Sequence, residues 1–563
     1  MRRALATLTM VFALALPAHA ERPRPLGWAM DAMRAGSWDN AALIARRDGA
    51  VAVDVIEWHR LRAGRGTYAE VTDFLRRRPD WPGEAYLRRQ SEEAVIREGD
   101  KAILDFFTGQ GPQTPEGVLA HAAALLRAYR LGEAQARLVL AWRTLPMSGN
   151  DQAKFIDAHG PLLKPHHAAR LDEMLWQREH AEARQMFDLV SDADKALAET
   201  RIALQNLDGD VNALIDALPA SKAGDPGLQA DRFEWRIRKG YGDSAKDLML
   251  SQSVSAAALG QPAAWANRRR ALARDEMRNG DPARAYQMAS KHFLSEGSHF
   301  ADLEWLSGYI ALRFLKDPKL ALGHFQAHDG AVESPISQGR AGYWQGRAYQ
   351  AMGDAEGAAK AYAQGAKFQS SFYGLLAAER GNLPFDPSLA GAPPEQDWRT
   401  SALAQAPLFQ AGLLLQASGE LSTAERFWTH LAEQLITEDA ALLGQAAIDV
   451  GQPHLAVMIG KRVAQRGITI AGPYYALHDA IKLDLNMAPE MVLAIARRES
   501  EFDPVVQSHV GARGLMQLMP ATAKDVARDL EISALHTTDR LTAELTPSSS
   551  VTVSRTMYVP AAA

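Results

Sequence analysis

The sequence contains no cysteine, which excludes disulfide bridges, thiolate metal ligands and lipid attachment through an N-terminal cysteine. Its net charge of −5 gives no sign of nucleic-acid binding, and two arginine runs, 76–78 and 268–270, are interpreted as solvated helix faces. Beyond residue 20 it lacks any run of about 18 apolar residues, the length that predicts a transmembrane helix. We therefore expect no membrane anchor and no nucleic-acid partner.

Strand patterns are nearly absent between residues 27 and 480, where apolar residues recur at three- and four-residue spacing and predict short helices. A glycine–acid pair or a close variant separates these helices; 36 residues lie from Asp281 to Asp317 and 37 from Asp317 to Asp354. The glycine can end one helix in a left-handed turn, and the acid can cap the next. A period in the thirties predicts two-helix hairpins stacked into an irregular, curved or ring-like α-solenoid. The pairs are Gly99-Asp100, Gly132-Glu133, Gly280-Asp281, Lys316-Asp317, Gly353-Asp354 and Gly419-Glu420.

Signatures of cofactor and metal sites are also missing. No phosphate-binding loop, dinucleotide glycine fingerprint or serine-hydrolase elbow occurs, so we expect no cofactor. His166 and His167 lie near Glu173 and His180, but adjacent histidines point apart on a helix. Residues 208–212 begin like a calcium loop, yet the required glycine and the closing glutamate are absent. We predict no metal site.

The first 20 residues have the pattern of a secretory signal peptide. Two arginines precede the apolar run 4–16, Pro17 then breaks the helix, and small residues stand before the expected cleavage site. A buried core helix is the alternative interpretation. We expect cleavage of residues 1–20, a mature chain from Glu21 and a periplasmic location.

The segment after Asn486 differs from the rest. Pro489 predicts the start of a helix, and 3.6-residue periodicity places Glu499 on one stripe with Val492, Ile495 and Ala496. A carboxyl partly withdrawn from water has a raised pKa, which suits a general acid acting on a glycosidic oxygen. Taken alone, this pattern is more typical of a solvated or capping glutamate near a helix end.

Residues 511–523, GARGLMQLMPATA, strengthen the first interpretation. Gly511 and Gly514 permit tight turns and a close approach of ligand to backbone. Gln517 and Met519 combine an amide with apolar surface, as in a sugar-binding groove, and Pro520 predicts the start of another helix.

Together these motifs carry a specific resemblance. ARRESEFDP at 496–504, Ser508 and the motif at 511–523 resemble the first half of the lysozyme-like domain of lytic transglycosylases. FLRRRPDWPG, YWQGRA and FYGLLAAE, at 74–83, 343–348 and 372–379, resemble the ring-shaped helical domain of the soluble members. The chain is thus identified as a member of the soluble lytic murein transglycosylase family. This implies an all-α fold: a superhelical ring of helical hairpins followed by a lysozyme-like α domain.

The resemblance also implies a reaction. Such enzymes cleave the β-1,4 bond between N-acetylmuramic acid and N-acetylglucosamine in peptidoglycan and leave a 1,6-anhydromuramic end. Glu499 matches their single catalytic acid and base; Ser508, Gly514, Gln517 and Met519 match positions beside the bound glycan. The implied partners are peptidoglycan strands and proteins of cell-wall synthesis or division.

Two alternatives stay open. One is an inactive periplasmic α-solenoid that serves as a scaffold or binds glycan. The other is a hydrolytic muramidase, which needs a second carboxylate. Glu501 and Asp503 are the only carboxylates near Glu499, and on a continuous helix Glu501 points about 200° away from Glu499.

The resemblance fails towards the end of the sequence. The family's second motif, Tyr-Asn-Ala-Gly, is absent, and residues 542–563 lack periodicity. We therefore expect a catalytic domain shortened by a frameshift or early stop, and an impaired activity. The predicted division is a signal peptide at 1–20, a solenoid at 21–385, a linker at 386–397, a helical linker domain at 398–483, the first part of the lysozyme-like domain at 484–541 and an irregular tail at 542–563.

Overall fold

The computed structural model of the protein describes residues 24–482 and 487–529. Within these ranges the chain forms helices and short turns, with no β-strand beyond two isolated bridges that join Gln507, Arg513 and Leu518. The predicted all-α fold is confirmed. In the same ranges, none of the helices combines the length and apolarity that crossing a membrane would require. The predicted signal peptide at 1–20 and the tail at 542–563 lie outside the described residues.

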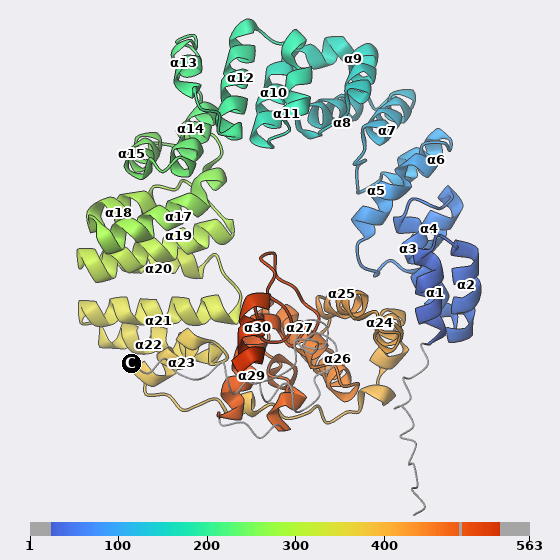
Figure 1. Ribbon diagram of the computed structural model, residues 1–563, viewed down its shortest axis with the longest axis vertical. Helices are drawn as coiled ribbons and strands as arrows, with labels where there is room; N and C mark the ends of the chain where they lie inside the picture. The colour runs from blue at the N-terminus through green and yellow to red at the C-terminus, as the bar shows by residue number, and fades with distance from the viewer. Residues whose placement is uncertain (1–23, 483–486, 530–563) are drawn as a thin grey trace, which may run out of the picture.

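The helices follow one another around an open ring, with the last helices lying inside its lower edge (Figure 1). The first part of the ring contains α1 Pro25–Arg34, α2 Trp38–Ala45, α3 Ala50–Arg62, α4 Tyr68–Arg77, α5 Glu84–Val95, α6 Asp100–Phe106, α7 Pro115–Arg127, α8 Leu131–Thr144, α9 Gly149–Leu163, α10 His167–Trp176, α11 His180–Gln185 and α12 Asp192–Asn206. It continues with α13 Val211–Asp216, α14 Pro226–Arg238, α15 Gly242–Gln252, α16 Ala256–Leu259, α17 Pro262–Asn279, α18 Pro282–Ser290, α19 Gly297–Ile310, α20 Pro318–Asp329, α21 Pro335–Met352, α22 Ala355–Gly365 and α23 Phe372–Arg380.

The remaining helices belong to the C-terminal third of the chain. They are α24 Pro407–Ala417, α25 Leu421–Ala432, α26 Thr437–Asp449, α27 Pro453–Ala464, α28 Ala471–Tyr474, α29 Pro489–Ser500 and α30 Pro520–Asp529. Between α23 and α24 the chain forms only short 3-10 turns. The domain boundaries drawn from the sequence stay a prediction.

The hairpin of α21 and α22 shows how the repeat signal works. Gly353 takes a left-handed φ of 78°, and the Asp354 carboxylate accepts a hydrogen bond of 2.8 Å from the Gly357 N–H. A Cβ on Gly346 would lie 2.5 Å from the Tyr362 ring, so glycine is what lets the two helices touch. The predicted turn followed by an acidic cap is confirmed at this site.

Other pairs depart from that prediction. α8 begins at Leu131, so Gly132 lies inside the helix, and the left-handed residue before it is Tyr129, with a φ of 60°. Gly99 has an extended backbone with a φ of −76° and precedes α6. A glycine therefore does not by itself mark the helix end, since a non-glycine residue can occupy a left-handed position at a cost of about 1–3 kcal/mol.

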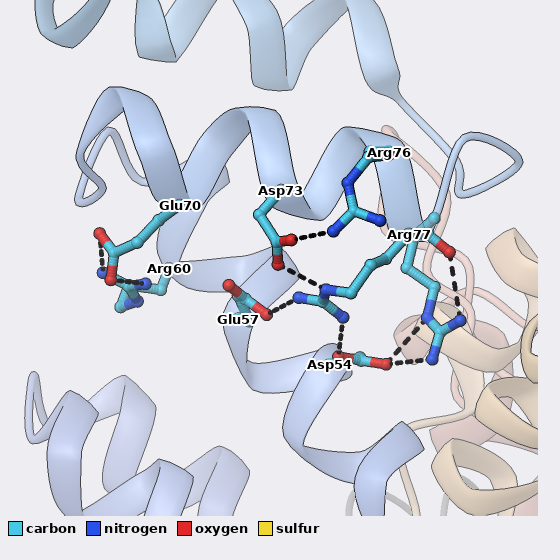
Figure 2. A network of polar contacts seen from close by, with 8 residues as sticks. Asp54, Glu57, Arg60, Glu70, Asp73, Arg76 and Arg77 are labelled. Carbon is cyan, nitrogen blue, oxygen red and sulfur yellow. Dashed lines mark hydrogen bonds and ion pairs between the residues drawn. The ribbon is translucent and has the colours of Figure 1, made fainter.

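In the first arginine run only Arg76 is exposed; Arg77 and Arg78 form tertiary ion pairs (Figure 2). Arg77 donates to Asp54 at 2.8 Å, to Glu57 at 2.7 Å and to Asp73 at 2.6 Å. The Nε of Arg78 donates to the second Asp54 oxygen at 2.8 Å. These contacts tie α4 to α3, because carboxylates distant in sequence meet the guanidinium groups once the helices pack.

The arginines of the second run, 268–270, also have partners on other helices. Arg269 is fully buried and donates to the Met288 carbonyl and the Ser253 hydroxyl, both at 2.7 Å. Its neighbours Arg268 and Arg270 pair with carboxylates of α14 and α19. The prediction of solvated arginines holds for Arg76 and Arg268, which are exposed, and was wrong for the other four. A run of like charge carries no information on its tertiary partners.

Hydrophobic contacts close the ring. Residues of α1–α6 share one buried cluster with residues of α24–α27 and of α29, and Figure 1 shows α1 and α24 side by side. The Phe427 ring lies 5.1 Å from that of Trp58 and 5.0 Å from that of Trp81. On the other side of the C-terminal helices, the Tyr475 hydroxyl donates to the Ser370 carbonyl at 2.9 Å. The C-terminal helices are thus held between the two ends of the arc.

Candidate active site

Helix α29 carries the candidate acid. It starts at Pro489, as predicted, and its buried face consists of Val492, Leu493, Ala496 and Ser500. Glu499 lies beside this face and its side chain is exposed. The expectation of a carboxyl partly withdrawn from water was therefore wrong for the described residues: at about 100° per residue, the centre of the buried stripe falls nearer Ser500 than Glu499.

Ser500 joins the helix to the loop that follows. Its hydroxyl is buried, 2.8 Å from the Leu515 carbonyl and 3.0 Å from the Ala496 carbonyl of its own helix. This contact brings Glu499 beside the motif at 511–519. A role for Ser500 was not predicted from the sequence. Its position directly after Glu499 is the one feature of the sequence that could have indicated it.

The loop after α29 gathers most of the predicted binding residues. The Ser508 N–H donates to the Ala512 carbonyl at 2.8 Å, and the Ala512 N–H donates to the Ser508 hydroxyl at 2.9 Å. Gly514 is buried with a φ of 71°. The Gln517 amide donates to the Gly514 carbonyl at 3.0 Å and to the Val506 carbonyl at 3.2 Å. Ser508, Gly514 and Gln517 therefore build one compact turn.

Met519 stands apart from that turn. It is 41% exposed and precedes α30, which begins at Pro520 as predicted. The site thus offers an exposed carboxyl, an exposed thioether and the backbone of a tight loop.

The neighbouring carboxylates already have partners. Glu501 lies beyond the end of α29 with a left-handed φ of 49°, and its carboxylate pairs with Lys461. Asp503 accepts a hydrogen bond of 2.9 Å from the Val505 N–H. The helical projection that turned Glu501 away from Glu499 does not apply, because the helix ends at Ser500.

Aromatic residues hold the other side of α29. The Arg497 Nε donates to the Tyr474 carbonyl at 3.1 Å, and its guanidinium lies 4.5 Å from the centre of the Tyr474 ring and 5.4 Å from that of Tyr475. Burial raises the pKa of the Tyr475 hydroxyl, which donates to Ser370. One arginine thereby connects the candidate catalytic helix to the ring.

The residues weighed as metal ligands have other contacts. The His180 Nε2 lies 2.7 Å from the Gln205 amide oxygen, and His167 packs against Trp142. Over residues 24–482 and 487–529, no three histidine, aspartate or glutamate side chains are arranged to hold a metal ion.

Comparisons with known proteins agree with this arrangement. The family model of the Transglycosylase SLT domain matches residues 477–553. The soluble lytic murein transglycosylase of Escherichia coli (strain K12) is 30% identical over 176 residues, which cover 29% of this chain and 25% of that protein. Its counterpart from Salmonella typhimurium is 29% identical over 194 residues, 34% of this chain and 29% of that protein. The aligned segments thus span about a quarter of these relatives.

Solved structures match over most of the chain. The 70 kDa soluble lytic transglycosylase of Escherichia coli has a TM-score of 0.59 at 19% identity and covers 95% of this chain and 86% of its own. An inactive mutant of the lytic transglycosylase Slt from Pseudomonas aeruginosa has a TM-score of 0.62 at 19% identity, covering 92% and 84%.

The fold is therefore that of a superhelical ring joined to a lysozyme-like α domain, as predicted. Over residues 477–553 the chain is similar to the Transglycosylase SLT domain, and the relatives that align with it are soluble lytic murein transglycosylases.

Proposed function

We propose that this protein is a lytic transglycosylase that cleaves the β-1,4 bond between N-acetylmuramic acid and N-acetylglucosamine in peptidoglycan. The observation that carries the proposal is the placement of Glu499. Its side chain is exposed in the last turn of α29, beside the 511–519 loop and inside the segment matched by the Transglycosylase SLT domain. A polysaccharide can reach such a carboxyl, whereas it cannot reach a carboxylate buried in a structural network.

In the proposed reaction one carboxyl performs both proton transfers. Glu499 gives its proton to the glycosidic oxygen as the bond from that oxygen to the muramic C1 breaks. The carboxylate then takes the proton of the muramic 6-hydroxyl as its oxygen bonds to C1. The product is a 1,6-anhydromuramic end, no water is consumed, and Glu499 returns to its protonated state.

The contacts of the nearby carboxylates support this reaction over hydrolysis. Ordinary glycosidases use two carboxyl groups, roughly 5–9.5 Å apart. Here Glu501 pairs with Lys461, and Asp503 accepts from a backbone N–H. A reaction that uses the substrate's own hydroxyl as nucleophile needs neither of them.

We further propose that the glycan lies along the loop after α29. The turn built by Ser508, Gly514 and Gln517 presents backbone groups, and Met519 presents exposed apolar surface. A structure of a 70-kDa soluble lytic transglycosylase in complex with bulgecin A makes this compound a candidate ligand for the same region. Cell-wall synthesis or division proteins are the proposed macromolecular partners.

We place the protein in the periplasm, where its substrate lies. The charged, apolar and small-residue pattern of residues 1–20 supports export, although these residues lie outside the described part of the chain.

One observation favours a second candidate function. Glu499 is exposed, whereas a general acid works best when partial burial keeps its proton on near neutral pH. The alternative is an inactive ring-shaped protein that binds glycan strands or serves as a scaffold.

A digest of purified peptidoglycan with the chain from Glu21 separates these functions. We expect mass spectrometry to find muropeptides with 1,6-anhydro ends. Reducing ends in their place would indicate a muramidase. Co-sedimentation with peptidoglycan in the absence of any soluble product would indicate the binding protein.

A further inference from the structure

The end of α29 is held by side chains from another helix. We propose that His454 and Lys461 of α27 form a clamp on Glu501 that positions Glu499 for proton transfer. This inference rests on the proposed function of Glu499, and it assigns two positioning residues that lie outside the segment matched by the catalytic family model.

The backbone at this point is strained. Glu501 and Phe502 follow the last helical residue with φ values of 49° and 67°, and neither is glycine. Two consecutive left-handed residues are costly and persist only where the surroundings hold them. Phe502 is buried, and its ring lies 5.4 Å from that of His478. Tertiary contacts therefore fix the chain direction immediately after the candidate acid.

Helix α27 supplies contacts to both parts of Glu501. The His454 Nδ1 lies 3.0 Å from the Glu501 carbonyl oxygen, and the Lys461 ammonium pairs with the Glu501 carboxylate. The other ring nitrogen of His454 lies 3.2 Å from a Glu425 oxygen on α25. The imidazole thus bridges α25 and the residue two positions after Glu499.

The chemistry of the partners defines the protonation state of the clamp. A carbonyl and a carboxylate only accept, so both ring nitrogens of His454 must carry a proton to donate to both. The charged groups that act on the imidazole are Glu425 from α25 and Asp503 after α29, while Glu501 faces it with its backbone carbonyl. Burial opposes the charged form, but hydrogen bonds to Glu425 and Glu501 outweigh it and hold the pKa of His454 above its usual 6.5. The clamp is complete at low pH and loosens as pH rises through that raised pKa.

Loss of the clamp is expected to act on turnover more than on binding. Releasing Glu501 lets the strained residues relax and the last turn of α29 fray. A misplacement of about 1 Å in a catalytic group can lower the rate about 10²-fold. The loop that contributes to glycan binding is held separately, through Ser500 and its own internal hydrogen bonds.

The test compares His454→Gln with His430→Gln in the full chain. His430 of α25 is a matched control, because its Nδ1 also lies 3.2 Å from a carboxylate oxygen, that of Glu433. This contact joins residues three positions apart, so it does not connect two helices. We expect kcat of H454Q to fall about tenfold or more with KM little changed, and kcat of H430Q to stay near that of the wild type. Adding Glu425→Gln to H454Q should lower kcat no further, since Glu425 acts through the imidazole. Equal effects of the two histidine variants, or additive effects of the double variant, would overturn the clamp.

Hydrogen exchange provides a readout that does not depend on activity. Amides of residues 497–505 should exchange faster in H454Q than in H430Q at one fixed pH, as expected for local opening. If the wild type makes no product, the proposed function fails while this comparison still decides the clamp. Equal exchange in the two variants would refute the clamp whatever the activity.

Discussion

Two glutamates, Glu499 and Glu304, illustrate how surroundings give a carboxylate its role. Glu304 accepts hydrogen bonds from His292 at 2.9 Å and from His324 at 2.6 Å, and the Tyr286 hydroxyl lies 2.8 Å from the second imidazole. Burial acts to raise the pKa of Glu304, but the two histidines outweigh it and lower the pKa to about 2. The Glu304 carboxylate therefore has a structural role. Glu499 is exposed, and within the described residues its carboxyl has no hydrogen-bonded partner.

Glu304→Gln should destabilise the protein in a pH-dependent way. At pH 7 we expect a loss of about 2–3 kcal/mol in the free energy of unfolding, typical of hydrogen bonds to a charged group. The folded-state pKa is depressed from 4.5 to about 2, so this contribution is fully present above pH 4.5 and is lost as pH falls towards 2. Urea denaturation at pH 7, 4 and 3 measures the difference.

An exposed glutamate serves as the control for that series. Glu356→Gln on α22 removes a surface pair with Lys360 and should cost less than about 0.5 kcal/mol at every pH. A difference between the wild type and E304Q that stays constant from pH 7 to pH 3 would contradict the role given to the two histidines.

Left-handed backbone after a helix end also affects the free energy of unfolding. Tyr129 lies two residues after the end of α7 with a left-handed φ of 60°, and its side chain is 96% exposed. Tyr129→Gly should therefore stabilise the protein by about 0.5–1 kcal/mol, because glycine removes the steric cost and no packing is lost. Urea denaturation at neutral pH checks this.

A glycine placed within the next helix gives the opposite sign. Leu140 is 59% exposed in α8, and Leu140→Gly should cost about 1 kcal/mol through lost helix propensity. If Tyr129→Gly destabilises the protein as Leu140→Gly does, backbone strain at Tyr129 does not determine the effect of the substitution on the free energy of unfolding.

Much of the element pattern could be predicted from the sequence, because it depends on local rules. The helix starts at Pro489 and Pro520 and the turn at Gly353 with its Asp354 cap follow from backbone geometry alone. The left-handed Tyr129 could not be predicted, because tyrosine is not a residue type that favours positive φ.

Tertiary contacts explain what was missed at the site. The sequence indicated the helix that carries Glu499 and the turn that follows it, but it misjudged the exposure of the carboxyl. The clamp joins residues 47 positions apart, and no local pattern relates His454 to Glu501. The same limit applies to Arg77, whose partners Asp54 and Glu57 belong to another helix.

For the whole molecule, the main feature is a ring closed by a few aromatic side chains. Phe427 on α25 is fully buried between Trp58 of α3 and Trp81 of the loop between α4 and α5. Arg34 of α1 adds an ion pair with Glu420 at the start of α25. Because Leu493 and Ala496 of α29 belong to the same buried cluster as α24–α27, closure of the ring also supports the candidate active site.

Phe427→Ala should change the shape as well as the stability. We expect a loss of about 3–5 kcal/mol from removing a buried aromatic side chain, and an increased radius of gyration in small-angle X-ray scattering as the closure loosens. Phe325→Ala is the matched control: Phe325 is equally buried, but within the ring wall on α20. If the two variants give the same scattering curve, Phe427 does not close the ring.

The central claim, that Glu499 carries both proton transfers, is tested most directly by a paired digest of peptidoglycan. Glu499→Gln is compared with Glu490→Gln, which alters an exposed glutamate in the first turn of the same helix. We predict that E490Q releases anhydromuropeptides at the wild-type rate and that E499Q loses at least about 10²-fold. Product formation by E499Q at the rate of E490Q would contradict the claim.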